Sequence, residues 1–169
     1  MPTIAGIRFL PVLLRAGLLC MVLLCLLAQG CGKTKIGGPS AGGPRVKSGP
    51  AVVATAKTQI GRQYKYGGST PKTGFDCSGL IQWSYKQHGV KVPRQAKDQA
   101  KAGRAVKKSQ LQPGDIVVFR ISSRSGVHTG LYSGKGKFVH SPSSGKKIRE
   151  DSINSDYWKR RYVSGRRVL

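Results

Sequence analysis

The order of apolar and polar positions divides the latter part of the chain into a helix-forming half and a strand-forming half. Apolar residues three to four positions apart indicate helices over 51–61 and 77–89, and Gly61 and Gly89 are placed to stop them. The apolar positions are Val52, Ala56 and Ile60 in the first segment, and Leu80, Ile81, Trp83 and Tyr85 in the second. The stretch 64–76 is rich in turn residues, and 93–103 predicts a short polar helix or turn.

The second half of this region favours antiparallel strands. Two strand-forming segments flank a "GKG" turn, which is the signature of a hairpin. The predicted strands cover residues 115–120, 127–134, 137–142 and 161–169. Because helices come first and antiparallel strands follow, the pattern predicts an α+β domain.

The N-terminus carries an export signal, which we assign to residues 1–30. Its only charges are Arg8 and Arg15, and the uncharged stretch from Ala16 to Gly30 follows them. That stretch has 15 residues, whereas a membrane-spanning helix needs about 20. We therefore expect a cleaved signal, with a true membrane anchor as the alternative.

The end of this signal, "LAQGC", resembles a bacterial lipobox with Cys31 as the first mature residue. The resemblance implies lipidation of the Cys31 thiol, and more than one acyl chain on a residue anchors a protein firmly. The residue after Cys31 is Gly32 and not the aspartate associated with inner-membrane retention in enteric bacteria. We expect a lipid-anchored protein of the bacterial envelope, in the outer membrane and facing the periplasm; cleavage without lipidation would leave it soluble.

Composition separates a linker from a domain. Residues 31–50 are dominated by Gly, Pro, Ser and Lys, which cannot bury enough apolar surface to become ordered. Residues 51–169 are long enough to form one domain with its own core.

The domain is strongly basic. Six of the 30 lysines and arginines precede residue 51 and all six acidic residues follow it, so residues 51–169 carry 24 basic and six acidic side chains, a formal charge of +18. Such a charge favours anionic partners. Export argues against nucleic acid, and anionic envelope polymers fit both facts; a solvated basic surface that only aids solubility is the alternative. No cluster of His and Cys has metal-ligand spacing, so we expect neither a metal nor a cofactor.

Cys77 is the one cysteine outside the N-terminal region, because Cys20, Cys25 and Cys31 belong to the signal and the lipobox. It stands where a Gly-rich turn enters a helix. The positive end of a helix lowers the pKa of a thiol, and free backbone N–H groups there can hold an oxyanion. We therefore predict that Cys77 is a nucleophile. The alternative is a buried structural cysteine.

A cysteine nucleophile needs a base and a residue that orients the base. His88 lies about 16 Å along the helix from Cys77, so we interpret it as structural. His128 and His140 stand on the two arms of the hairpin, equidistant from Gly134, and are predicted to lie side by side across the ladder. The pattern indicates a Cys–His–His arrangement, unless the histidines are a chance pair in the core.

Five segments in this order and spacing resemble the NlpC-type cell-wall peptidases, which are papain-like cysteine hydrolases: "YKYGGSTPKTGFDCSGL", "VPR", "LQPGDIVVF", "HTGLYSGKGKFVH" and "SDYWKRRY". The resemblance covers residues 51–169. It implies a helix that carries the nucleophile, packed on an antiparallel sheet that carries both histidines. Thr129 departs from the apolar residue usual at its position, and we expect no effect on the chemistry.

The resemblance also implies the roles of single residues. Cys77 is implied to be the nucleophile, His128 the general base and His140 the residue that orients His128. Three residues around the nucleophile are implied to line the site or bind substrate: Tyr64 near the oxyanion, and Asp76 and Ser78 at the free amine of the substrate.

The implied reaction is amide hydrolysis through a thioester in the peptide stems of peptidoglycan, either between D-glutamate and the diamino acid or at the crosslink. One alternative is a non-catalytic lipoprotein that binds the wall, although intact Cys77, His128 and His140 argue against it. The other is an acyltransferase on the same fold, which shares the Cys–His logic. We expect a monomer, and the sequence leaves open whether an adaptor or activator protein is needed.

Overall fold

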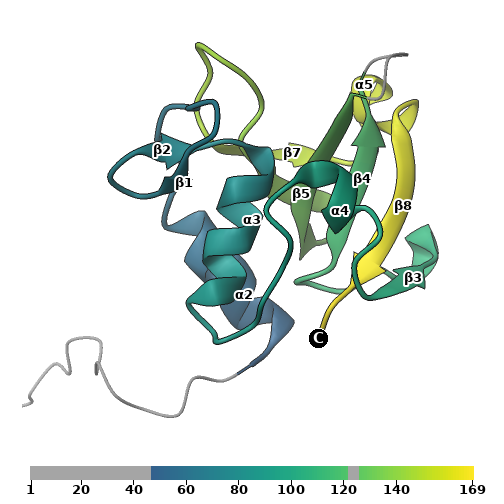
Figure 1. Ribbon diagram of the computed structural model, residues 1–169. Coiled ribbons are helices and arrows are strands. Elements are labelled where there is room, and N and C mark those ends of the chain that lie inside the picture. Colours follow the sequence, from purple (N-terminus) through teal and green to yellow (C-terminus); the bar gives the residue numbers. More distant parts are fainter. Residues whose placement is uncertain (1–46, 122–125) are drawn as a thin grey trace, which may run out of the picture. The chain divides into compact units, whose positions relative to one another are not determined.

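The computed structural model of the chain describes residues 47–121 and 126–169 (Figure 1). The signal, Cys31 and most of the predicted linker lie outside these residues. The helical elements are α2 (Gly49–Lys57), α3 (Cys77–Lys86), α4 (Ala96–Gln99), the 3₁₀ turn η1 (Lys108–Gln110) and α5 (Asp156–Lys159). The strands are β1 (Ser69–Thr70), β2 (Gly74–Phe75), β3 (Arg104–Val106), β4 (Ile116–Arg120), β5 (Val127–Gly134), β6 (Lys137–His140), β7 (Arg149–Ser152) and β8 (Tyr162–Arg167).

Six of the strands form one antiparallel sheet in the order β3-β8-β4-β5-β6-β7. Helices α2 and α3 pack against β5 on one side of this sheet (Figure 1). The short β1–β2 hairpin lies at the start of α3. The α+β prediction is confirmed. Among the described residues, no helix is long and apolar enough to span a membrane.

Helix α2 begins earlier and ends earlier than the sequence predicted. Ser48 caps its first turn by accepting a hydrogen bond from the backbone N–H of Ala51, so the helix starts inside the segment assigned to the linker. After Lys57 the backbone N–H groups of Gln59, Ile60 and Arg62 bond to carbonyls three residues back, which tightens the chain into turns. Ile60 is therefore 45% exposed, and its predicted place on the apolar face of the helix is wrong.

Helix α3 ends as the sequence predicted. Gly89 has a φ of 70°, and the N–H of Val90 bonds to the carbonyl of Tyr85. The N–H of Gly89 bonds to the carbonyl of Lys86, so the end is a Schellman motif with Gly89 in the left-handed position.

The β5–β6 hairpin is present, but its register differs from the prediction. The turn residues are Lys135 and Gly136, with φ of 51° and 70°, as in a type I′ turn. The turn is therefore centred one to two residues beyond Gly134, and the ladder pairs Leu131 with Val139. His128 and His140 are therefore not a directly opposed pair of this ladder, but their rings meet across it at 2.9 Å, so the prediction that they lie side by side is confirmed.

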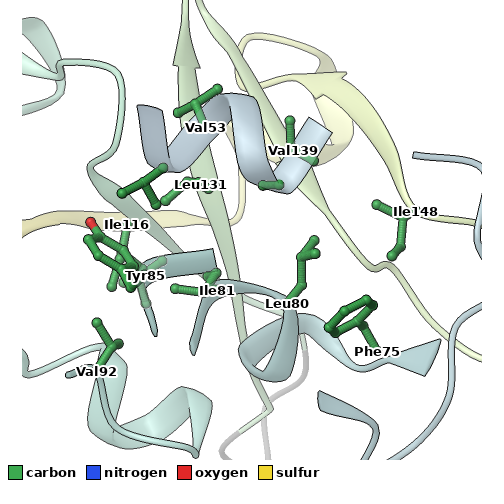
Figure 2. Packing of buried hydrophobic residues seen from close by; sticks show 13 residues of the cluster. Val53, Phe75, Leu80, Ile81, Tyr85, Val92, Ile116, Leu131, Val139 and Ile148 are labelled. Carbon is green, nitrogen blue, oxygen red and sulfur yellow. The ribbon is translucent and has the colours of Figure 1, made fainter. Parts of the chain in front are cut away.

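The core occupies both faces of the sheet because side chains alternate along each strand. On one face, Leu80, Ile81 and Tyr85 of α3 pack with Val53 of α2 against sheet residues such as Leu131 (Figure 2). The opposite face carries an aromatic cluster made of Phe119, Phe138 and Trp158 with Val117 and Ile153. Each large side chain buried in this way contributes about 1.5–3 kcal/mol. The two clusters hold the start of α3 and the first residues of β5 in place.

Candidate active site

The Asp76 carboxylate organises the start of the helix that carries Cys77. It caps α3 by accepting a 2.7 Å hydrogen bond from the N–H of Gly79, and it accepts another, at 3.1 Å, from the N–H of Gly67. Both of its oxygens also bond to the guanidinium of Arg94, at 3.0 and 2.7 Å. Cys77 therefore follows a residue that is held from three directions.

Close packing at the next turn of this helix explains the glycine of "DCSG". A Cβ on Gly79 would lie 2.1 Å from the carbonyl oxygen of Gly68, so any other residue would push the Gly-rich turn away. Ser78 is buried, and its hydroxyl donates to Asp76 and accepts from Arg94.

These contacts bear on the two residues predicted to bind the substrate amine. Asp76 and Ser78 do stand beside Cys77, but both already bond to Arg94 in the free protein. An ammonium group would have to share the Asp76 carboxylate with that guanidinium. Their role as substrate-binding residues stays a prediction. Arg94, quoted in the sequence only as part of "VPR", is a further residue of this cluster.

The Cys77 thiol lies against Thr129, the residue after His128 on β5. Burial raises the pKa of this thiol, hydrogen bonds from Thr129 act in the opposite direction, and the charge of Asp76 raises it further. The net direction is upward, so the expectation of a lowered thiol pKa at a helix start is wrong here. In the free protein at neutral pH the thiol is protonated, and it needs a base when it attacks.

Thr129 and Gln99 connect α3, which begins at Cys77, to β5, which carries His128. The Thr129 hydroxyl donates to Gln99 Oε1 at 3.0 Å, and Gln99 Nε2 donates to the carbonyl of Ser78 at 2.9 Å. Gln99 is fully buried. The expectation that Thr129 does not bear on the chemistry is wrong, because this residue touches the thiol and ties β5 to the first turn of α3.

His128, His140 and Asp151 form one hydrogen-bonded chain. His128 Nε2 lies 2.9 Å from His140 Nδ1, and His140 Nε2 lies 3.0 Å from Asp151 Oδ2. A carboxylate only accepts, so neutral His140 carries its proton on Nε2 and uses Nδ1 as an acceptor. His128 then carries its proton on Nε2, and its Nδ1 lone pair is free to act as a base.

Asp151 is held on its other sides by two donors. The Arg149 guanidinium binds both of its oxygens, at 2.9 and 3.0 Å, and the indole N–H of Trp158 donates at 3.0 Å. The hydrogen bond from His140 is the main reason why the pKa of Asp151 lies well below its usual range. No sequence pattern pointed to Asp151; assigning 149–152 as a third strand after the hairpin would have placed it on the face of His140.

Both histidines are neutral at neutral pH. His128 is 2% exposed, and burial followed by the nearby His140 lowers the pKa of His128 to about 3. Burial also lowers the pKa of His140, although Asp151 acts against it. A neutral imidazole with a free lone pair is the form that can take a proton from a thiol.

Trp158 covers the two histidines. Its ring stacks on His128 with centroids 5.3 Å apart at 24°, and it meets His140 edge-on at 5.0 Å. This cover excludes water from the His128–His140 hydrogen bond.

Tyr64 lies near Cys77, and its place at the oxyanion stays a prediction. Burial is the main cause that raises the pKa of its hydroxyl, and the charges of Cys77 and Asp76 contribute next, which places the ring within electrostatic reach of both. Its backbone N–H bonds to the carbonyl of Lys146 at 2.8 Å, so the segment before β7 runs beside it. The structure thus gathers Tyr64, Asp76 and Ser78 around Cys77, and pairs the two predicted histidines on the adjoining strands.

Comparison with known proteins gives a consistent result. The protein-family model described as NlpC/P60 family matches residues 61–167. Over 115 residues the chain is 44% identical to murein DD-endopeptidase MepH of Escherichia coli (strain K12), which covers 66% of this chain and 42% of that one. It is 40% identical over 154 residues to gamma-DL-glutamyl hydrolase of Bacillus subtilis (strain 168), covering 89% of this chain and 36% of the relative.

Solved structures agree with this. An NlpC/P60 family protein from Bacillus cereus ATCC 10987 superposes with a TM-score of 0.67 at 33% identity, over 72% of this chain and 40% of that one. The NlpC/p60 domain of peptidoglycan hydrolase SagA gives 0.61 at 30% identity, over 71% of this chain and 98% of that domain. The chain spans less than half of the length of the two curated relatives named above.

Proposed function

The chain belongs to the NlpC/P60 family, and from that premise we propose that it is a cysteine peptidase that cleaves amide bonds in the peptides of bacterial peptidoglycan. The observation that supports this most is the chain Asp151–His140–His128. It leaves a basic nitrogen on His128, next in sequence to the residue that contacts the Cys77 thiol.

In the proposed reaction, His128 Nδ1 takes the thiol proton while the Cys77 sulfur attacks the carbonyl carbon of the substrate. The resulting oxyanion is stabilised by free N–H groups at the start of α3 and by the Tyr64 hydroxyl. Protonated His128 then gives its proton to the leaving amine, and a thioester remains on Cys77. Water, deprotonated by His128, hydrolyses the thioester and restores the thiol.

The substrate class follows from charge and from the relatives. Residues 51–169 have a formal charge of +18, which favours peptides that carry carboxylates. Two similar proteins are named a murein DD-endopeptidase and a gamma-DL-glutamyl hydrolase. The bond that this chain cuts is one of those two kinds.

The purified chain incubated with peptidoglycan tests this proposal. We expect new free amines, with cleavage products identified by mass spectrometry, and none from the Cys77→Ala variant. Peptidoglycan bound but left intact by the wild type would instead make the chain a binding protein. Products joined to an added amine, in place of hydrolysed products, would make it an acyltransferase.

We also propose that the mature chain is anchored through lipid on Cys31, in the outer membrane and facing the periplasm. The "LAQGC" segment and the Gly-rich linker that follows it support this. Labelled fatty acid should be incorporated into the wild type and not into Cys31→Ser. Label that persists in the variant would show that Cys31 is not the lipidated residue.

A further inference from the structure

A cavity of about 450 Å³ opens beside the proposed base. Its wall includes His128 but none of the residues around the nucleophile, namely Cys77, Tyr64, Asp76 and Ser78. It is formed by the end of β4, the segment after β6, the strand β7 and the region of α5. The substrate part that enters this cavity therefore lies beside His128 and not beside the residues that surround the thiol.

The position of the cavity next to His128 indicates which half of the substrate enters it. The acyl half becomes bound to Cys77, whereas the leaving amine takes its proton from His128 and must stand against that ring. The residue that carries the leaving amine then occupies the space on the His128 side. This step rests on the proposed peptidase function.

The wall of the cavity contains both cationic and apolar side chains. Lys146 and Arg149 supply two positive charges, and Asp151 is the acidic residue of the wall. Asp151 is already engaged by Arg149, His140 and Trp158. Within residues 47–121 and 126–169 the Lys146 ammonium makes no ion pair, so it is available to an incoming anion.

Two exposed side chains of the wall provide apolar contact area. Ile121 and Tyr157 line the cavity and are 42% and 48% exposed, which is high for large apolar side chains. A hydrocarbon stem that lies on these two side chains would remove them from water. The Lys146 ammonium and the two apolar side chains together fit a substrate residue that has a carboxylate and an aliphatic chain.

We propose that this cavity binds the amine-donating half of the substrate and that Lys146 selects a residue whose amine-bearing carbon also carries a carboxylate. Diamino acids with an amine and a carboxylate at each end have this chemistry. At the crosslink, the end of such a diamino acid that supplies the leaving amine also carries a free carboxylate, whereas in the bond to D-glutamate the carboxyl of that carbon continues the stem as an amide.

The test compares two substrates that differ at one group. Crosslinked stem peptides are prepared with either a free carboxylate or a carboxamide on the carbon that bears the leaving amine, and kcat/KM is measured for both. The wild type should prefer the carboxylate by about tenfold, as expected for one charge-assisted hydrogen bond. Lys146→Gln should remove most of this preference.

Lys147→Gln is the matched control. Lys147 is the next residue in the chain and does not line the cavity, and its replacement by Gln removes the same charge as Lys146→Gln. This variant should keep the wild-type preference. Equal loss in both variants would assign the effect to the overall positive field, and a wild type without preference would also overturn the proposal.

A binding measurement separates this proposal from the peptidase function. The free diamino acid and its carboxamide are titrated while the NMR signal of the Trp158 indole N–H is followed, with the second tryptophan, Trp83, as internal reference. We expect a carboxylate-selective shift in the wild type that is lost in Lys146→Gln. If neither peptide substrate is cleaved but this shift is present, the peptidase proposal fails and the binding site stands. If the shift is absent or equal for both compounds, the site is overturned.

Discussion

Nε2 of His128 lies 2.9 Å from Nδ1 of His140, so the protonated nitrogen of one ring determines the protonated nitrogen of the other. Because Asp151 can only accept, the proton positions follow in order from Asp151 to His140 to His128. Asp151 does not contact His128, but through His140 it determines that the Nδ1 of His128 keeps its lone pair.

The first prediction concerns His140. In His140→Asn the amide oxygen can still accept the N–H of His128, whereas His140→Ala leaves that N–H without a partner. We expect His140→Ala to lower kcat by about 100-fold or more and His140→Asn to keep at least ten times the activity of His140→Ala. Steady-state kinetics on peptidoglycan peptides measures this. Equal losses in the two variants would show that His140 does not orient the base.

The second prediction concerns Asp151, which acts as a positioning residue through His140. Asp151→Ala should lower kcat by roughly 10- to 100-fold with little change in KM, because the proton position on both histidines is no longer determined.

Glu150→Ala is the matched control for Asp151, since Glu150 is the neighbouring acid on β7 and bonds to Ser133 and Lys57 instead. It should keep near wild-type activity. Two-dimensional NMR of the imidazole nitrogens should show mixed protonation states in Asp151→Ala alone. An unchanged nitrogen spectrum there would contradict the positioning role.

The third prediction concerns the pH at which the thiol ionises. Burial raises the pKa of Cys77, so its alkylation by iodoacetamide should reach half of its maximal rate above the ordinary thiol value of about 8.5. Residues 47–169 contain one cysteine, so for a chain cut after its signal and lipidated on Cys31 the reaction reports Cys77. A midpoint at or below the ordinary value would show a thiolate stabilised by the helix start.

The fourth prediction concerns stability in acid. The pKa of His128 is about 3 in the folded protein and about 6.5 in an unfolded chain, so below pH 6.5 the unfolded state binds the additional proton. The free energy of unfolding should therefore fall as the pH decreases from 6.5 toward 3. Urea unfolding at pH 7, 5.5 and 4.5 should show a weaker decline in His128→Gln than in the wild type. The same decline in both proteins would contradict the buried neutral state.

The fifth prediction concerns Thr129. In Thr129→Val the buried Oε1 of Gln99 loses its donor, which should cost about 1–3 kcal/mol of stability, and the pKa of Cys77 should rise further. Thr129→Ser keeps the hydroxyl and is the control. Chemical unfolding and the alkylation profile measure the two effects, and a valine variant as stable as the serine variant would show that this link is not needed.

Local features of the sequence were sufficient to predict those parts of the fold that depend on residues close together in the chain. The stop at Gly89 involves residues within one turn of α3, and the hairpin turn needs residues that accept positive φ. The α+β order and the family resemblance follow from such local patterns, which is why both are confirmed. Cys77 as the residue at the helix start, and the pairing of His128 with His140, could be predicted for the same reason.

Only the tertiary structure decided the features that depend on distant segments. The register that puts His140 diagonal to His128 depends on which residues occupy the turn, and a shift of one position moves every pair. Asp151 joins the histidines because β7 pairs with β6, and Thr129 meets the thiol because β5 packs on α3. The thiol pKa shows the same division. The helix start alone predicts a lower value, but surrounding segments remove water from Cys77, and this burial outweighs the hydrogen bonds of Thr129 and Ser78 that favour the thiolate.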